Sequence, residues 1–182
     1  MKIVQLNAAT LPVYRNELAE LLIDAVAQGA SVGYTDALTL EEAQDYIHTL
    51  RDGMVKNHRL VWIARDQRGM IGSIQLDLCM KPNGQNRAEI QKLLVHSQVR
   101  RQGIGKALMA VLERTAQDRQ RGLLYLDTQS GSPAEAFYRT LGYRCLGEIP
   151  DYACTPDGYY HPTAIYYKRL FAANQHARSL AS

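Results

Sequence analysis

The stretch VRRQGIGKALM, residues 99–109, combines residue types and spacing that suit an anion. Gly103 and Gly105 stand where a loop meets an amphipathic helical pattern, and glycine lets a phosphate approach the backbone without a Cβ in the way. The first amides of a helix have no intrahelical partner and carry the positive end of the helix dipole. The basic side chains beside the glycines are Arg100, Arg101 and Lys106. The stretch therefore predicts a cradle for a pyrophosphate.

Other interpretations of the same glycines are weaker or less specific. A glycine turn ahead of a solvated basic helix would explain Gly-x-Gly taken alone. The stretch is not a Walker loop, because no Gly-Lys-Ser/Thr follows. A dinucleotide-binding fold fits poorly, since its glycines follow the first strand, whereas several predicted strands and two predicted helices precede them here.

Hydrophobic periodicity defines the elements that must position the cradle. Helices are predicted after caps at Thr10, Thr39 and Ser132 and after the cradle glycines, and Thr39 forms a capping box with Glu42. Strands are predicted over 2–7, 60–66, 70–80, 87–95, 123–128, 143–149 and 164–170. Consecutive early strands favour antiparallel pairing, and the strand–helix–strand unit 87–128 favours one parallel pair. We expect a single α+β domain, with a mixed, mostly antiparallel sheet flanked by helices.

Length and composition narrow the class of protein. The 182 residues suit one domain, expected over 1–172, and the tail 173–182 lacks an apolar pattern and is expected to be flexible. A net charge of +3 argues against a nucleic-acid partner and suits a local anion site. The three cysteines are too scattered for a zinc site and are expected to be reduced. With neither a signal peptide nor a membrane span predicted, we expect a cytoplasmic protein.

Two motifs give the chain a resemblance to a known family. LLVHSQVRRQGIGKALM resembles motif A of the GCN5-related N-acetyltransferases (GNAT), whose Gln/Arg-x-x-Gly-x-Gly/Ala pattern matches Arg100, Gly103 and Gly105. AEAFYRTLGY, 134–143, is similar to a second family signature, and the order of elements matches over nearly the whole chain. The resemblance implies that the pyrophosphate belongs to acetyl-CoA. The implied cofactor-binding residues are Leu93, Leu94, Val95, Arg100, Arg101, Gln102, Gly103, Ile104, Gly105 and Lys106.

A closer likeness is to the tabtoxin-resistance acetyltransferases. The shared stretches are GASVG, KPNG, NRAE, QKL, LLYLDT, TPDG and HPTAIYY. The chain departs from the wider family at two places: Ser97 stands where proline is common, and Gly131 where asparagine is common. The second departure removes one expected side-chain contact with the cofactor arm.

The resemblance also implies catalytic residues. Backbone groups around Leu93 to Val95 would pair with the pantetheine arm and polarise the thioester carbonyl. Tyr138 would be a general acid for the leaving thiolate, since a phenol stays protonated at neutral pH. Glu89 and Asp127 compete for the role of base toward the acceptor amine, and each could instead bind the ammonium group or form a salt bridge. Burial or a relaying water would be needed to make either an effective base.

The expected reaction is direct acetyl transfer, in a ternary complex, to a primary amine of a small molecule such as a tabtoxin-type antimetabolite. Ser31, Tyr34 and Tyr152 are expected to contact this acceptor, and no metal is expected. A protein or peptide acetyltransferase and a non-catalytic CoA sensor are the alternatives. Neither the acceptor nor the choice between monomer and homodimer follows from the sequence.

Overall fold

The computed structural model describes residues 1–173 except 36 and 156–157, so most of the predicted tail lies outside the described residues. One seven-stranded sheet runs through this described part in the order β1-β2-β3-β4-β5-β7-β6. The strands are β1 Lys2–Leu6, β2 Arg59–Asp66, β3 Gly69–Leu78, β4 Arg87–Val95, β5 Leu123–Gln129, β6 Arg144–Cys154 and β7 Tyr160–Arg169. The helices are α1 Leu11–Ala27, α2 Leu40–Val55, α3 Ile104–Asp118 and α4 Pro133–Thr140. The predicted α+β fold is confirmed, and β4 with β5 is its parallel pair.

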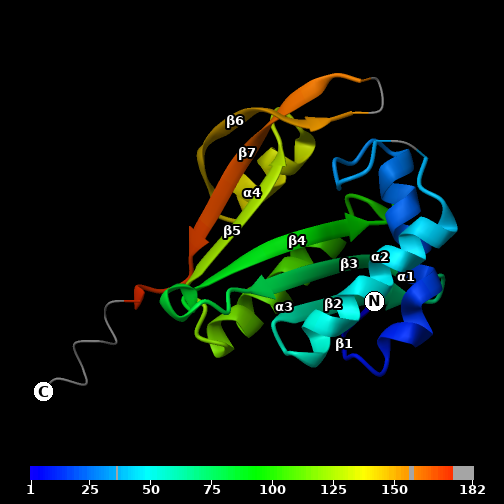
Figure 1. Ribbon diagram of the computed structural model, residues 1–182, viewed down its shortest axis with the longest axis horizontal. Helices are drawn as coiled ribbons and strands as arrows, with labels where there is room; N and C mark the ends of the chain where they lie inside the picture. Colours follow the sequence, from blue (N-terminus) through cyan, green and yellow to red (C-terminus); the bar gives the residue numbers. More distant parts are fainter. Residues whose placement is uncertain (36, 156–157, 174–182) are drawn as a thin grey trace, which may run out of the picture.

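Helices cover both faces of the sheet and bury two cores (Figure 1). Strand residues alternate between the faces, so Trp62 and Ile74 pack toward α3 and α4, whereas Val61 and Ile63 pack toward α1 and α2. Leu108 and Leu112 of α3 are completely buried in the first core. These two apolar layers fix the sheet rigidly between the helices.

β4 and β5 separate soon after they begin. They pair only at Arg87–Leu123, Ala88–Leu124 and Glu89–Tyr125, although β4 continues to Val95 and β5 to Gln129. Figure 1 shows the two strands diverging from this junction. The facing edges of their later residues are therefore free of each other, and a V-shaped opening divides the sheet.

The helix caps agree with the sequence in part. Thr39 and Glu42 form the predicted capping box, in which the Glu42 amide donates to Thr39 Oγ1 at 3.2 Å. Thr10 and Ser132 occupy the cap positions of α1 and α4, but neither side chain makes a capping hydrogen bond. Thr10 Oγ1 instead accepts from the Asn7 amide in the preceding turn. The predicted side-chain caps at these two positions were wrong.

The segment 150–163, between the last two predicted strands, is largely strand in the structure. β6 runs to Cys154 and β7 starts at Tyr160, so these strands form a hairpin through most of the segment expected to be irregular. Register shifts after Cys145 and Ile149 and the positive φ of Asp151 (52°) interrupt the pairing. Bulges of this kind admit residues that a regular ladder would reject, which is why the segment resembled a loop.

Candidate functional site

The end of β4 is irregular where it faces the opening. Lys92 has φ 48°, and the register against β3 shifts so that Gln75 pairs with Gln91 and Ser73 with Leu94. This bulge turns the end of the strand, and the β5 side of Leu93 to Val95 lies beyond the last β4–β5 pair. Backbone groups of an unpaired strand edge are a template for an extended ligand. The predicted positions for the pantetheine arm are therefore structurally suited to it.

The cradle stretch has the backbone of an anion site. Arg101 (φ 64°) and Gly103 (φ 80°) are left-handed, and α3 begins at Ile104. The Ala107 amide donates to the Gly103 carbonyl at 3.0 Å, so the amides of 103–106 precede that first turn of bonds. A Cβ added at Gly103 would meet no atom within 4 Å, whereas one at Gly105 would lie 3.3 Å from the Phe137 ring. The first glycine leaves open space for a ligand, and the second allows α3 to approach α4.

Three carboxylates gather on the α1/α2 face of the sheet beside the opening. Glu89 pairs in register with Asp77 of β3, and Asp127 lies two residues beyond Tyr125, the β5 partner of Glu89. Burial raises the pKa of the Glu89 carboxyl, the charges of Asp127 and Asp77 raise it further, and a Gln91 hydrogen bond and Arg59 oppose them. Asp127 is exposed and accepts a hydrogen bond from Thr163 Oγ1 at 3.2 Å. The structure thus brings the two predicted base candidates together.

Arg59 of β2 organises the polar side chains under these carboxylates. It donates to Asp77 Oδ2 at 2.9 Å, to Gln75 at 3.3 Å and also to Gln91. His58 Nδ1 lies 3.2 Å from Asp77 Oδ1. Asp77 is therefore paired with Arg59 within the sheet, whereas Glu89 and Asp127 lie beside the opening.

Tyr138 lies on the opposite face, on α4. It is 8% exposed and packs edge-on against Phe137 and Tyr143, with ring centroids 5.3 and 5.9 Å away. Burial, with a smaller contribution from Asp127, raises the pKa of its phenol far above the ordinary value. The hydroxyl therefore holds its proton at neutral pH, as a general acid must.

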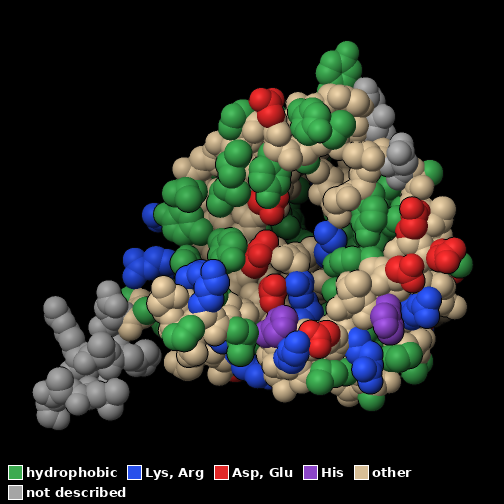
Figure 2. All heavy atoms as spheres, in the orientation of Figure 1, with side chains coloured by type: hydrophobic (Ala, Val, Ile, Leu, Met, Phe, Trp, Pro, Cys, Tyr) green, Lys and Arg blue, Asp and Glu red, His purple; other side chains and the backbone are tan. Residues whose placement is uncertain are grey.

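The predicted acceptor residues come from two directions. Tyr152 of β6 is half exposed, and the charge of Asp127 is the main cause that raises its pKa. Burial raises the pKa of Tyr46, and Tyr34, which lies between α1 and α2 and packs on the second core, adds a smaller upward shift. Ser31 is exposed in the same connection. Figure 2 shows the surface hollowed between the β6–β7 side and the α1–α2 connection.

Two further residues near Glu89 and Asp127 were absent from the predicted site. The Tyr46 hydroxyl of α2 donates to Gln75 Oε1 at 3.1 Å, and the Lys92 ammonium lies 5.5 Å from the centre of the Tyr46 ring. Burial lowers the pKa of Lys92, whereas the charges of Asp127 and Glu89 oppose this change. Tyr46 fitted the apolar face of its helix, and Lys92 lay in a strand, so sequence spacing alone gave no signal that they meet.

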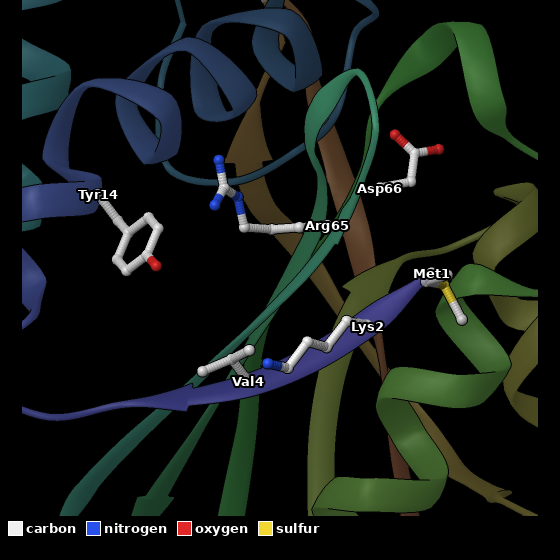
Figure 3. A pocket seen from close by; sticks show the side chains of 6 residues that line it. All are labelled: Met1, Lys2, Val4, Tyr14, Arg65 and Asp66. Atoms are coloured by element: carbon white, nitrogen blue, oxygen red, sulfur yellow. The ribbon is translucent and has the colours of Figure 1, made fainter.

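A separate shallow pocket lies at the other end of the sheet, on β1 and β2 (Figure 3). Arg65 in its wall lies over the Tyr14 ring and is paired with Glu17 at 3.1 Å. The Arg65 guanidinium is thus engaged in structural contacts. The chemistry-bearing residues gather instead at the β4–β5 opening.

Comparisons with known proteins agree with this geometry. A family model described as an acetyltransferase (GNAT) domain matches residues 57–145, which include β4, the cradle and α4. This central part of the chain is therefore similar to GNAT acetyltransferase domains. The match supports an acyltransferase that uses acetyl-CoA. The unpaired β4 edge and the open space at Gly103 fit the two parts of that molecule, an extended arm and a pyrophosphate.

Solved structures of low sequence identity share the fold over almost the whole chain. A ribosomal-protein-alanine N-acetyltransferase from Brucella melitensis is 20% identical, with a TM-score of 0.75 over 93% of this chain and 100% of that one. A Salmonella typhimurium protein solved with its cofactor acetyl-CoA is 13% identical, with a TM-score of 0.75 over 93% and 94%. An aminoglycoside 6'-N-acetyltransferase complexed with coenzyme A is 20% identical, with a TM-score of 0.70 over 94% and 98%.

Within the residues that the structure describes, no three or more His, Cys, Asp or Glu side chains are grouped as metal ligands. In the same residues, no helix is long and apolar enough to cross a membrane.

Proposed function

We propose that this chain is a GNAT acetyltransferase that transfers the acetyl group of acetyl-CoA to a primary amine of a small molecule, by direct attack in a ternary complex. The observation that carries the proposal is that Glu89 and Asp127 lie beside the β4–β5 opening, while Tyr138 is packed on the other face of the sheet within range of the Asp127 charge. Asp127 raises the pKa of both other groups, which indicates that it lies within electrostatic range of each. A sensor that only bound CoA would not require this combination.

The cosubstrate would be held by backbone groups first. Amides of 103–106 would bind the pyrophosphate at the positive end of α3, and basic side chains at the rim would add charge. The β4 edge around Leu93 to Val95 would hold the arm and donate a hydrogen bond where negative charge develops. Acetyl-CoA supplies an activated acetyl thioester. All these contacts are made by the main chain or at the rim. They therefore tolerate the departures from the family pattern at Ser97 and Gly131.

The acceptor amine must lose a proton before it attacks. Glu89 is our preferred base, because its raised pKa makes its carboxylate a stronger base than an exposed carboxylate. Asp127 is more exposed and would hold the incoming ammonium group in place. Tyr138 Oη would then supply the proton that the leaving thiolate requires.

The walls of the hollow suggest a compact acceptor. Tyr34 and Tyr152 would flank it and Ser31 would lie at its rim, while Lys92 would favour an acceptor that also carries a negative group. A tabtoxin-type β-lactam amino acid has this character, in line with the closer resemblance of the sequence. Cytoplasmic location stays a prediction.

A peptide amine is the second candidate acceptor. The similarity of fold to a ribosomal-protein-alanine N-acetyltransferase favours it. A protein terminus would need the hollow to remain open between the β6–β7 hairpin and the α1–α2 connection, whereas a small amine requires only the carboxylates.

Thiol release from acetyl-CoA tests the proposal. The acceptor panel comprises tabtoxinine-β-lactam, other amino acids, aminoglycosides and N-terminal peptides. Rapid release with a small amine, and intersecting initial-rate patterns that indicate a ternary complex, are the expected results. Preference for a peptide would establish the second candidate. If protein that binds acetyl-CoA releases thiol with none of these acceptors, both candidates are refuted. Individual Cys79→Ser, Cys145→Ser and Cys154→Ser variants should keep the rate, because direct transfer uses no acetyl-cysteine.

A further inference from the structure

The loop that leads into the cradle is held from α1 by a bidentate contact. The Ser97 amide donates to Asp24 Oδ2 at 2.8 Å, and the Ser97 hydroxyl donates to Asp24 Oδ1 at 2.6 Å. The two residues are 73 positions apart in the chain. Asp24 therefore connects the first helix with the short turn between β4 and α3.

Asp24 is poorly placed for the stability of its own helix. It lies in the last turn of α1, which ends at Ala27, and a negative charge there meets the negative end of the helix dipole. Burial opposes its ionisation, but both Ser97 hydrogen bonds, helped by His96 and Arg100, outweigh burial and lower the pKa of the carboxyl. The carboxylate is thus satisfied by the cradle loop rather than by the helix that carries it.

The contact fixes one end of a short, constrained path. Ser97 begins the 3-10 turn Ser97–Val99, and Val99 at its end is buried in the core beneath α3. The left-handed Arg101 and Gly103 follow within four residues of Val99. Because Asp24 holds Ser97 and the core holds Val99, the residues from 100 to the start of α3 have few conformations open to them.

We infer that Asp24 is a positioning residue for the cosubstrate, because it holds Ser97 and thereby keeps the cradle loop in the shape that receives a pyrophosphate. Preorganised anion sites bind better because the loop does not have to be ordered on binding. Proline at position 97 would supply neither the amide nor the hydroxyl donor. This inference rests on the proposed role of the cradle.

The charge of Asp24 and its hold on the loop should change the affinity for CoA in opposite directions. If Asp24 acted only through its charge, removing it would strengthen the binding of an anion. If it positions the loop, Asp24→Ala should weaken CoA binding about tenfold despite the lost repulsion. Glu20→Ala, which removes an exposed carboxylate from the same helix, is the matched control.

The first measurement is the Kd of CoA by titration calorimetry for the wild type, Asp24→Ala, Ser97→Ala and Glu20→Ala. The second is the KM of acetyl-CoA against that of acetyl-pantetheine, which lacks the pyrophosphate. We expect higher Kd and KM for the CoA compounds in Asp24→Ala, a smaller rise in Ser97→Ala, and no change with acetyl-pantetheine or in Glu20→Ala. Should Asp24→Ala fail to fold, Ser97→Ala carries the comparison alone, since it deletes a single side-chain hydrogen bond.

Unchanged or tighter CoA binding in Asp24→Ala would overturn the inference. So would equal losses with both thioesters, which would indicate general damage to the fold. A wild type that does not bind CoA would refute the proposed cradle itself, and this outcome is separate from any result on the variants.

Discussion

Glu89 and Asp127 lie on neighbouring strands but in different surroundings, and this difference suggests how the work is divided. Glu89 is partly buried between Asp77 and Asp127, and it shares Gln91 with Arg59. Asp127 is exposed at the edge of the opening and is bound by Thr163. Both were predicted from the sequence. Their contrast was not, since burial depends on how far β4 and β5 diverge, which the sequence does not give.

The Glu89 carboxylate should oppose folding at neutral pH. Its folded pKa is raised, so the stability linked to its proton is complete below about pH 4 and is lost as the pH rises through that raised value. Glu89→Gln should therefore raise the Tm at pH 7 by about 2–4 °C and lower kcat by about 10²-fold. Differential scanning calorimetry at pH 7 and pH 3.5 would check this, because the Tm difference should vanish at the lower pH. A lower Tm at pH 7, or full activity, would contradict it.

A pH profile separates the two carboxylates. If Glu89 is the base, kcat/KM falls at low pH as this group becomes protonated. Asp127→Asn removes a charge that raises the Glu89 pKa, so the fall should move to a lower pH. A fall that disappears in Asp127→Asn, instead of moving, would make Asp127 the base.

Tyr138→Phe tests the proposed acid. The ring packs in the core and the loss of the hydroxyl leaves that packing intact, so we expect kcat to fall about 10²-fold with the Kd of CoA unchanged. Tyr143→Phe is a matched control, because its hydroxyl donates to Glu113 at 3.0 Å and has no proposed role in transfer. An unaltered kcat in Tyr138→Phe would exclude the acid role.

The bounds and bulges of the strands decide where the residues of the candidate site lie. The bounds of β4, 87–95, were predicted correctly, because a turn signal precedes the strand and the cradle stretch follows it. Its bulge at Lys92 was not predicted, since it arises from pairing with β3 and leaves no mark in the alternation of residues. The two strands of the β6–β7 hairpin were predicted, but their inner ends, 150–154 and 160–163, were missed. Pro150 and Pro162 suggest a loop there, whereas residues on either side of them pair.

Two properties of the junction between the loop and α3 can be tested separately: the left-handed backbone of Gly103 and the open space beside it. Gly103→Ala places a side chain on a left-handed residue and should lower stability by about 1 kcal/mol. Gly103→Asn should recover much of this loss, because asparagine tolerates that backbone conformation. Both side chains enter the open space, so both should weaken CoA binding about tenfold, as thermal melts and calorimetric titration would check. An Asn variant that binds CoA as well as the wild type would show that only the backbone shape matters.

The whole molecule consists of two parts of one sheet that share a short join. Overall class, the parallel pair and the placement of helices on both faces followed from the order of the elements. The hollow did not follow, because it depends on how far β4 and β5 diverge and on contacts such as that of Lys92 with Tyr46, which lie far apart in sequence. The loop and helix start of the proposed anion cradle were recognisable because all their parts lie within eleven consecutive residues.

The three-pair join between β4 and β5 also has a consequence for how much enzyme a cell keeps. A ligand laid along the β4 edge adds hydrogen bonds that the protein alone does not make, and anything that binds only the folded state stabilises it by mass action. Differences of 1–2 kcal/mol in stability are enough to change abundance several-fold through degradation. The supply of acetyl-CoA would then set the lifetime of this protein as well as its rate, so that a starved cell would lose the enzyme along with its substrate.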